Sequence, residues 1–332
     1  MKWLVTGGAG FVGSNLISEL LSDEDPQHVV VLDNFSASSF EEFSATAPLD
    51  RVERIEADAP VWGSSRTLGI VEGDIRDMDA VSRVTQGADI IVHLAANTGV
   101  APSVENPRLD NEMNVGGTLN MLEGARAAGV SRFVFASSGA PAGICEPPIT
   151  EDISPRPISP YGASKLAGEA YCCAYATSFG VPTVALRFSN IYGPRSWRKG
   201  SVVAAFIRQA LAGEPITVNG DGSQTRDFIH VNDLTRAIRL AATHGAASGE
   251  LYQISTGRET SVNELLALLE ERFAAAGLPS IERRSGVRAP ADVLRNFADA
   301  SKAAQDLGWR AQKDLAAGLD ETLDWFLNYV KT

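Results

Sequence analysis

Tyr161 and Lys165 are the residue pair with the clearest capacity for chemistry, within the run Tyr161-Gly162-Ala163-Ser164-Lys165. Side chains four residues apart lie on the same face of a helix. A lysine ammonium beside a phenol favours the phenolate and lowers the phenol pKa, which makes tyrosine a base near neutral pH. The same spacing also suits a half-buried tyrosine and a solvated lysine without function, so the rest of the chain must decide.

A helix is expected to carry this pair. Pro157 and Pro160 precede it, and apolar residues recur through Leu166, Ala170 and Ala174. This pattern predicts a helix that starts near Ser159.

A glycine-rich turn at the N-terminus predicts a dinucleotide site. The apolar strand Lys2 to Thr6 runs into glycines at positions 7, 8, 10 and 13, and a helical pattern follows. Such glycines allow a tight turn and let a pyrophosphate lie at a helix N-terminus. A second strand, His28 to Leu32, ends in Asp33, at the spacing of the acid that binds the adenosine ribose. Because no Arg or Lys follows in residues 34–36, we expect NAD rather than NADP.

Further strands are expected at Leu68 to Val71, Ala88 to Ala95, Arg132 to Ser138 and Pro182 to Ser189. They alternate with helical patterns, one over 111–128, and predict an α/β fold with a doubly wound parallel (Rossmann) sheet. Residues 36–67 are expected to form a surface excursion with one helix. The hydroxyls of Ser137 and Ser138 then follow a strand at the edge where ligands bind.

Three polar residues near this edge have different expected roles. Asp74 either accepts a hydrogen bond from the adenine amino group or caps the next helix. His93 lies in an apolar run and is expected to be a core histidine. Asn114 is expected to bridge backbone groups near the site.

Composition excludes several classes of function. The chain has 332 residues, 44% of them hydrophobic, and a formal net charge of -12. An acidic chain argues against nucleic acid as the partner. No run is long enough to span a membrane. Cys145, Cys172 and Cys173 form no disulfide framework, so we expect a cytoplasmic location, and the four scattered His predict no metal site.

The second half of the chain is expected to bind the substrate. We expect residues 1–190 to form the NAD-binding domain and residues 191–332 a smaller α/β substrate-binding domain, with the chain able to cross back. Asn190 follows a strand, and the helix Ser201 to Leu211 offers Val203 to a nucleobase. Arginine forks suit a diphosphate, and Arg226 and Arg288 are candidates.

Taken together, these segments resemble the extended short-chain dehydrogenase/reductase family, and its nucleotide-sugar epimerases in particular. The resemblance covers nearly the whole chain. It rests on the runs 6–13, His93-Leu94-Ala95-Ala96, Ser137-Ser138, Tyr161 to Lys165, Arg187 to Pro194, and Asn219 to Phe228.

The resemblance implies an NAD-dependent 4-epimerase of a UDP-hexose that acts through a transient 4-keto sugar, with Ser138, Tyr161 and Lys165 as catalytic residues. It implies a homodimer as well. The implied NAD contacts are Gly7, Gly10, Phe11, Val12, Gly13, Asp33, Asn34, Asp74, Ile75, Leu94, Ala95, Ala96, Asn114, Tyr161, Lys165 and Phe188. The implied substrate contacts are Ser138, Asn190, Val203, Arg226, Arg288, Asp292 and Asn296.

Other activities on the same scaffold stay open at this point. They are a UDP-glucuronate epimerase or decarboxylase, a dehydratase, and a non-catalytic NAD-binding regulatory protein. Three departures from the family pattern bear on them. Gly139-Ala140 stands where dehydratases carry an Asp-Glu pair, and Trp197 stands where uronate enzymes tend to carry an Arg. Ala142 replaces an aromatic residue that walls the sugar pocket.

Overall fold

The computed structural model describes residues 1–22, 27–46, 52–63, 68–245, 248–287 and 293–331. It divides the chain into two compact units. The first contains residues 1–143, 154–187 and 235–252, and the second contains residues 144–153, 188–234 and 253–332. These boundaries differ from the expected 1–190 and 191–332, because the chain passes between the units repeatedly.

The main sheet is the expected doubly wound sheet, with eight strands among the described residues. Its order is β12-β7-β6-β5-β1-β2-β4-β3, and the pairs from β6 through β3 are parallel. The strands are β1 (Lys2–Thr6), β2 (His28–Asp33), β3 (Val52–Arg54), β4 (Leu68–Glu72), β5 (Ile90–His93), β6 (Arg132–Ser138), β7 (Thr183–Phe188) and β12 (Glu250–Ile254). The short strand β3 lies in the segment that the sequence assigned to a surface excursion.

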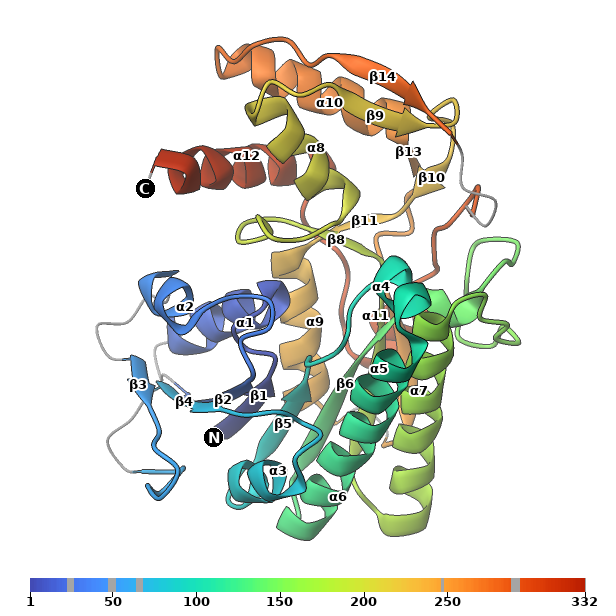
Figure 1. Cartoon of the computed structure of the whole chain (residues 1–332). Helices are drawn as coiled ribbons and strands as arrows, with labels where there is room; N and C mark the ends of the chain where they lie inside the picture. The colour runs from blue at the N-terminus through green and yellow to red at the C-terminus, as the bar shows by residue number, and fades with distance from the viewer. Residues whose placement is uncertain (23–26, 47–51, 64–67, 246–247, 288–292, 332) are drawn as a thin grey trace. The chain divides into compact units, whose positions relative to one another are not determined.

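The first unit covers this sheet with helices on both faces, as the near-continuous apolar strands require. Helices α3, α6 and α7 lie side by side in Figure 1, and residues of α6 and α7 share one core with Leu4 and Val30 of the sheet. Most of its helices are α1 (Phe11–Ser22), α2 (Phe40–Thr46), α3 (Met78–Thr85), α4 (Val100–Glu105), α5 (Pro107–Asn111), α6 (Thr118–Ala128) and α7 (Pro160–Phe179).

Helix α7 begins where the sequence predicts. The Ser159 hydroxyl accepts a hydrogen bond from Gly162 N at 3.1 Å, and Pro160 occupies the first turn. Gly180 ends the helix in the left-handed conformation. Gly168 lets α7 approach β6 closely, because a Cβ there would lie 2.3 Å from the Phe135 ring. This close packing fixes the helix against the strand that ends in Ser138.

The expected helix over 111–128 is interrupted. Residues 112–117 form a π-helical turn, η1 (Glu112–Gly117), between α5 and α6. Such turns occur frequently at functional sites. The Gly116-Gly117 pair is the sequence feature that accompanies it.

The second unit has small sheets and its own core. Strand β8 (Asn190–Tyr192) pairs with β11 (Phe228–His230), β9 (Ile216–Asn219) with β14 (Arg283–Gly286), and β10 (Thr225–Arg226) with β13 (Thr260–Ser261). Figure 1 shows β9 and β14 beside α10 (Val262–Ala275). Helices α8 (Val202–Leu211) and α12 (Leu315–Lys331) share a core with α10. The remaining helices are η2 (Ala140–Ala142) in the first unit, α11 (Ser301–Asp306) in the second, and α9 (Val231–Thr243), which belongs to both.

Candidate active site

The glycine loop lies against the end of β5. Gly7 has φ +68°, and a Cβ on it would lie only 2.8 Å from Ala95 N. The loop is closed by a hydrogen bond from Gly10 N to Gly7 O at 3.1 Å, and Ala95 N donates to Thr6 Oγ1 at 3.2 Å. The turn therefore offers bare backbone beside helix α1, which is what a pyrophosphate requires.

Asp33 lies at the end of β2 and contacts this loop. Its carboxylate accepts hydrogen bonds from Ala9 N and Phe35 N, both at 2.9 Å. Burial raises the pKa of Asp33, and these two backbone bonds oppose the rise. A carboxylate has about four acceptor positions, so about two remain for a pair of ribose hydroxyls. The loop and this acid together fit the adenosine half of NAD.

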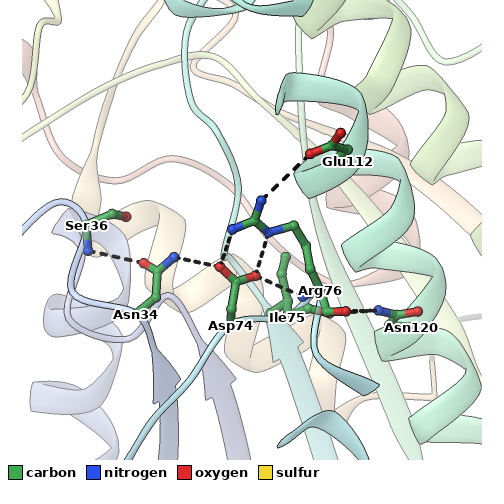
Figure 2. A network of polar contacts seen from close by, with 7 residues as sticks. All are labelled: Asn34, Ser36, Asp74, Ile75, Arg76, Glu112 and Asn120. Carbon is green, nitrogen blue, oxygen red and sulfur yellow. Dashed lines mark hydrogen bonds and ion pairs between the residues drawn. The ribbon is translucent and has the colours of Figure 1, made fainter. Parts of the chain in front are cut away.

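Asp74 lies in a network of polar contacts that follows β4. Its carboxylate accepts from Arg76 Nε at 3.0 Å and Arg76 Nη2 at 2.8 Å, and from Asn34 Nδ2 at 3.1 Å (Figure 2). These partners, Arg76 above all, lower the pKa of Asp74 to about 2. The expected helix-capping role is wrong, because Asp77 caps α3 by accepting from Asp79 N and Ala80 N.

Asn114 joins three segments of the site, as expected. It is 1% exposed, accepts from Asn97 N at 2.8 Å, and donates to Asn97 O at 3.0 Å and to Ser164 Oγ at 3.1 Å. Asn97 is a residue that the sequence analysis missed. Its side-chain Nδ2 is buried and has no hydrogen-bond partner among the described residues. An unpartnered amide two residues beyond Ala95 fits a site that a bound molecule completes.

Ser138, Tyr161 and Lys165 come together at the end of β6. The Tyr161 hydroxyl shares a hydrogen bond with Ser138. Lys165 is 4% exposed, donates from Nζ to Ala136 O at 2.9 Å, and has Nζ 5.9 Å from the Tyr161 ring centroid. The three residues thus supply a phenol, a hydroxyl and a cation in one place.

The expected effect of the lysine on the tyrosine pKa is wrong for the unliganded protein. Burial raises the pKa of Tyr161 to about 12, the hydrogen bond with Ser138 opposes this, and Asp110 adds to it. Desolvation of the buried phenol is the largest of these effects, and Lys165 Nζ donates to the backbone oxygen of Ala136.

His93 is a core histidine, as expected. It is 1% exposed, and its two ring nitrogens contact Thr6 Oγ1 at 2.7 Å and Thr118 Oγ1 at 3.1 Å. Burial lowers its pKa to about 3, so it is neutral near pH 7 and has no free nitrogen for catalysis.

A buried ion pair joins α7, the helix that carries Tyr161 and Lys165, to strand β7. Arg187 of β7 donates to both carboxylate oxygens of Glu169 on α7, at 2.8 and 2.7 Å, and Ser137 Oγ donates to Glu169 at 2.5 Å. Both charged side chains are nearly inaccessible, at 2% and 7% exposed. Glu169 lies one helical turn beyond Lys165, and the sequence analysis did not single it out.

Comparison with known proteins places these observations in a family. A sequence model of the NAD dependent epimerase/dehydratase family matches residues 3–255. The chain belongs to this family. It is 36% identical to the UDP-glucose 4-epimerase of Mycolicibacterium smegmatis, over 99% of both chains.

Solved structures of nucleotide-sugar epimerases are similar to this chain along its full length. The UDP-glucose 4-epimerase of Thermotoga maritima, determined with UDP-glucose, has a TM-score of 0.85 and 33% identity and covers 99% of this chain and 100% of its own. The UDP-glucuronic acid 4-epimerase of Bacillus cereus, in complex with UDP-glucuronic acid and NAD, has a TM-score of 0.86 and 30% identity, with the same coverage.

The remaining residues that were expected to contact NAD, the cofactor of this family, lie at the ends of strands and at the start of α1. Leu94, Ala95 and Ala96 are half-buried after β5, and Asn34 lies in the Asp74 network. Ile75 is 3% exposed, because its side chain packs against Gly117 of η1. The others lie at the start of α1 (Phe11, Val12 and Gly13) and at the end of β7 (Phe188).

Among the residues that the structure describes, those expected at the substrate belong to the second unit, apart from Ser138. Asn190 is half-buried at the start of β8, with N donating to Asp227 O at 2.9 Å. Arg226 Nη1 donates to Val293 O at 2.7 Å, so it holds the backbone that follows residues 288–292. Asn296 is half-buried. Arg288 and Asp292 lie outside the described residues.

The expected contact of Val203 with a nucleobase is wrong, and the replacement of an aromatic residue by Ala142 does not open the pocket. Val203 is 1% exposed and packs in the core of the second unit, so its side chain does not face a nucleobase. Ala142 is also 1% exposed, so the missing aromatic leaves no open space at that position. Trp197 packs against Phe326, with ring centroids 5.3 Å apart.

In the described part of the chain no cluster of three or more His, Cys, Asp or Glu could hold a metal, and no helix could span a membrane.

Proposed function

We propose that this protein is an NAD-dependent 4-epimerase of a UDP-hexose, with UDP-glucose and UDP-galactose as its substrates. The observation that carries the proposal is the joint placement in one unit of a glycine loop, Asp33, and the group of Ser138, Tyr161 and Lys165. The UDP-glucose 4-epimerases similar to this chain along its full length support UDP-hexose as the substrate class.

The chain's own residues manage the proton at the sugar 4-oxygen. When bound, NAD supplies a reversible hydride acceptor for C4 and a positively charged nicotinamide ring. Tyr161, as the phenolate, takes the proton from the 4-hydroxyl and returns it when the alcohol is restored on the other face. Ser138 hydrogen-bonds the same oxygen, and the Lys165 charge favours the phenolate.

The second unit contains the residues that would bind the nucleotide. Asn190, Arg226, Arg288 and Asp292 would hold the UDP portion, which does not react. Binding energy from a remote part of a substrate can hold the reacting sugar in position. A sugar ring held only through its nucleotide can present either face, as epimerisation requires.

Two alternative reactions have less support. A dehydratase needs an acid and a base after the serine, and Gly139-Ala140 offers neither. A uronate enzyme needs a cation for the sugar carboxylate, and Trp197 at the corresponding place packs against α12. A purely regulatory protein would not need Ser138, Tyr161 and Lys165 together.

We also propose a homodimer in the cytoplasm. The three free cysteines, Cys145, Cys172 and Cys173, support a reducing compartment. The exposed aromatic residues Tyr171 and Phe179 on α7 support the dimer.

Product analysis tests the proposed function. Purified protein is incubated separately with UDP-glucose and UDP-galactose, and the sugars are separated and quantified. Each should convert to the other until one equilibrium mixture is reached, and reduced nicotinamide absorbance should rise transiently. Tyr161→Phe should retain NAD and fold but lose about 10²–10⁴-fold in kcat, because its base is gone. A product that has lost water, or a near-wild-type rate for the variant, would overturn the proposal.

A further inference from the structure

One segment of the second unit, residues 293–299, is fastened to strand β10, and we call this segment the strap. Its first residue, Val293, accepts a hydrogen bond on its backbone O from Arg226 Nη1 at 2.7 Å. The next, Leu294, accepts one on its backbone O from Thr225 N at 2.8 Å. Thr225 and Arg226 are the two residues of β10, so this short strand holds the start of the strap through its backbone.

The third residue of the strap, Arg295, is held through its side chain. Its guanidinium donates two parallel hydrogen bonds to the Glu259 carboxylate, from Nε at 2.7 Å and from Nη2 at 2.9 Å. Its Nη1 donates to Glu146 at 3.2 Å. A bidentate pair fixes the orientation of the guanidinium as well as its charge. Glu259 therefore determines where this side chain points.

Glu259 is itself joined to β10. Thr225 Oγ1 donates to Glu259 Oε1 at 2.5 Å, and Glu259 directly precedes β13, which pairs with β10 (Figure 1). The hydrogen bonds of Glu259, those from Arg295 above all, lower its pKa to about 2, so the carboxylate is charged near pH 7. Thr225 thus holds the strap twice, through its backbone N and through the carboxylate that binds Arg295.

This arrangement also determines how Asn296 is directed. The Arg295 guanidinium lies 5.7 Å from the Phe297 ring centroid, so the side chains of residues 295 and 297 lie on the same side of the strap. The strap has neither helix nor turn at residues 295–297. Because successive side chains of an extended segment point to opposite sides, Asn296 is directed away from Glu259.

The exposure of the pair does not make it unimportant. The side chains of Arg295 and Glu259 are 50% and 26% exposed. Exposed ion pairs generally contribute little, but bidentate geometry and membership in a network are the exceptions. Glu259 has both, because it binds Arg295 by two hydrogen bonds and accepts a third from Thr225.

We propose that Glu259 is a positioning residue for the sugar nucleotide, because through Arg295 it fixes the strap that carries Asn296 and directly follows Asp292. The inference rests on the proposed function, in which Asn296 and Asp292 contact the substrate. It gives Glu259 and Arg295 a role without contact to the reacting atoms.

Titration calorimetry of UDP on protein saturated with NAD tests this role. Glu259→Gln should raise the Kd for UDP about fivefold, the effect of one well-oriented exposed ion pair. Arg295→Met should have the same effect, and the double variant should be no weaker than either single variant, because both changes remove one interaction. The KM for UDP-glucose should rise in parallel with kcat nearly unchanged, and the Kd for NAD should stay the same.

Glu270→Gln is the matched control. Glu270 accepts from Arg283 Nε at the same distance of 2.7 Å, and its side chain is 38% exposed. The inference is overturned if Glu259→Gln raises the Kd for UDP no more than this control, if the effects of Glu259→Gln and Arg295→Met add, or if NAD affinity falls equally. A wild type that binds UDP but interconverts no UDP-hexose would overturn the proposed function alone, because the Kd comparison does not depend on turnover. A wild type that does not bind UDP would overturn both.

Discussion

Tyr161 must lose a proton to act as a base, and the unliganded protein opposes this. Burial raises its pKa to about 12, from an ordinary value of 10.0. Between those values the native state retains a proton that the unfolded chain has lost, so this residue's contribution to stability decreases as pH rises above about 10. Lys165 and a bound nicotinamide cation act in the opposite direction and should lower this pKa in the complex.

Difference titration of wild type against Tyr161→Phe should reveal this behaviour. Without nucleotide, the ultraviolet phenolate signal attributable to Tyr161 should appear only near pH 12. With NAD and a UDP-sugar bound it should appear at lower pH, and kcat should rise with pH through the same range. Phenolate already present near pH 7 in the unliganded protein would contradict the effect assigned to burial.

We propose that Asn296 determines which substituents at C2 of the sugar are accepted. In the resembled epimerases, an acid that corresponds to Asp292 binds the ribose of the sugar nucleotide, and the position four residues later, Asn296 here, walls the sugar pocket. The resemblance implies that a Tyr at this position excludes N-acetylated sugars. The amide of Asn296 is smaller and can hydrogen-bond an N-acetyl group, and loss of one pocket contact costs only about 1–3 kcal/mol. We therefore expect turnover of UDP-N-acetylglucosamine as well as UDP-glucose.

The ratio of kcat/KM for these two substrates measures the effect. Asn296→Tyr should lower the ratio for the N-acetylated sugar at least about tenfold and leave UDP-glucose nearly unchanged. Asn296→Ser is the matched control, since it keeps the position small. The role assigned to Asn296 fails if the wild type ignores N-acetylated sugars or if Tyr leaves the ratio unchanged.

At single positions, the sequence predicted correctly where a residue lies when its place depends on local spacing. It did not predict contacts that depend on segments far away in the chain. Asp33 and His93 lie where their strands predict. The role of Asp74 depends on Arg76 and on Asn34, which is 40 residues earlier in the chain. Val203 faces the core because of packing with α10 and α12, which a helical pattern alone does not reveal.

At the level of elements, the Glu169–Arg187 pair is a buried ionic link between α7 and the sheet. Removing one partner of a buried ion pair leaves an uncompensated charge and costs about 3–5 kcal/mol. Glu169→Ala should therefore lower the free energy of unfolding by about that amount, as measured by denaturant titration. It should also reduce kcat, because Lys165 and Tyr161 lie on the same helix.

An exposed ion pair provides the control. Arg258 and Asp314 lie 3.7 Å apart with side chains 79% and 61% exposed. Arg258→Ala should cost no more than about 1 kcal/mol. If the two substitutions destabilise the protein equally, the buried pair does not have the structural role assigned to it.

Helix α7 was predictable from the sequence, whereas η1 and β3 were not. A serine cap, a proline in the first turn and a terminal glycine mark α7 locally. Asn114 of the π-helical turn bonds to Asn97 and Ser164, which come from other elements, and local spacing does not predict such contacts. Strand β3 has only three residues, and its pairing with β4 becomes visible only in three dimensions.

At the level of the whole molecule, the doubly wound parallel sheet was predictable from alternating strands and helices, but the unit boundaries were not. Residues 144–153 belong to the second unit and residues 235–252 return to the first. Strand β12, at the edge of the main sheet, begins within this late segment and ends two residues beyond it. Its sequence, Glu250 to Ile254, has nothing that assigns it to an N-terminal domain.

The outer face of α7 provides the argument for a homodimer. Tyr171, Tyr175 and Phe179 form a row along the helix, with ring centroids 6.5 and 4.9 Å apart. Tyr171 and Phe179 are 37% and 48% exposed. Neighbouring exposed aromatic side chains on one helix are typical of a surface that another protein chain covers. Aromatic side chains and arginine are enriched at protein interfaces, and Arg126 lies 4.0 Å from the Phe179 ring centroid. A second copy of the chain would cover this row.

Light scattering on the eluting protein tests the dimer. Wild type should have a mass twice the 35.3 kDa of the chain. Tyr171→Glu combined with Phe179→Glu should weaken dimerisation by at least about 30-fold, because two buried aromatic anchors would be replaced by charges. Ile158→Glu is the control: Ile158 is also 48% exposed but lies outside α7, so the dimer should persist. A monomeric wild type, or a double variant that dimerises as well as the wild type, would exclude this face of α7 as the interface.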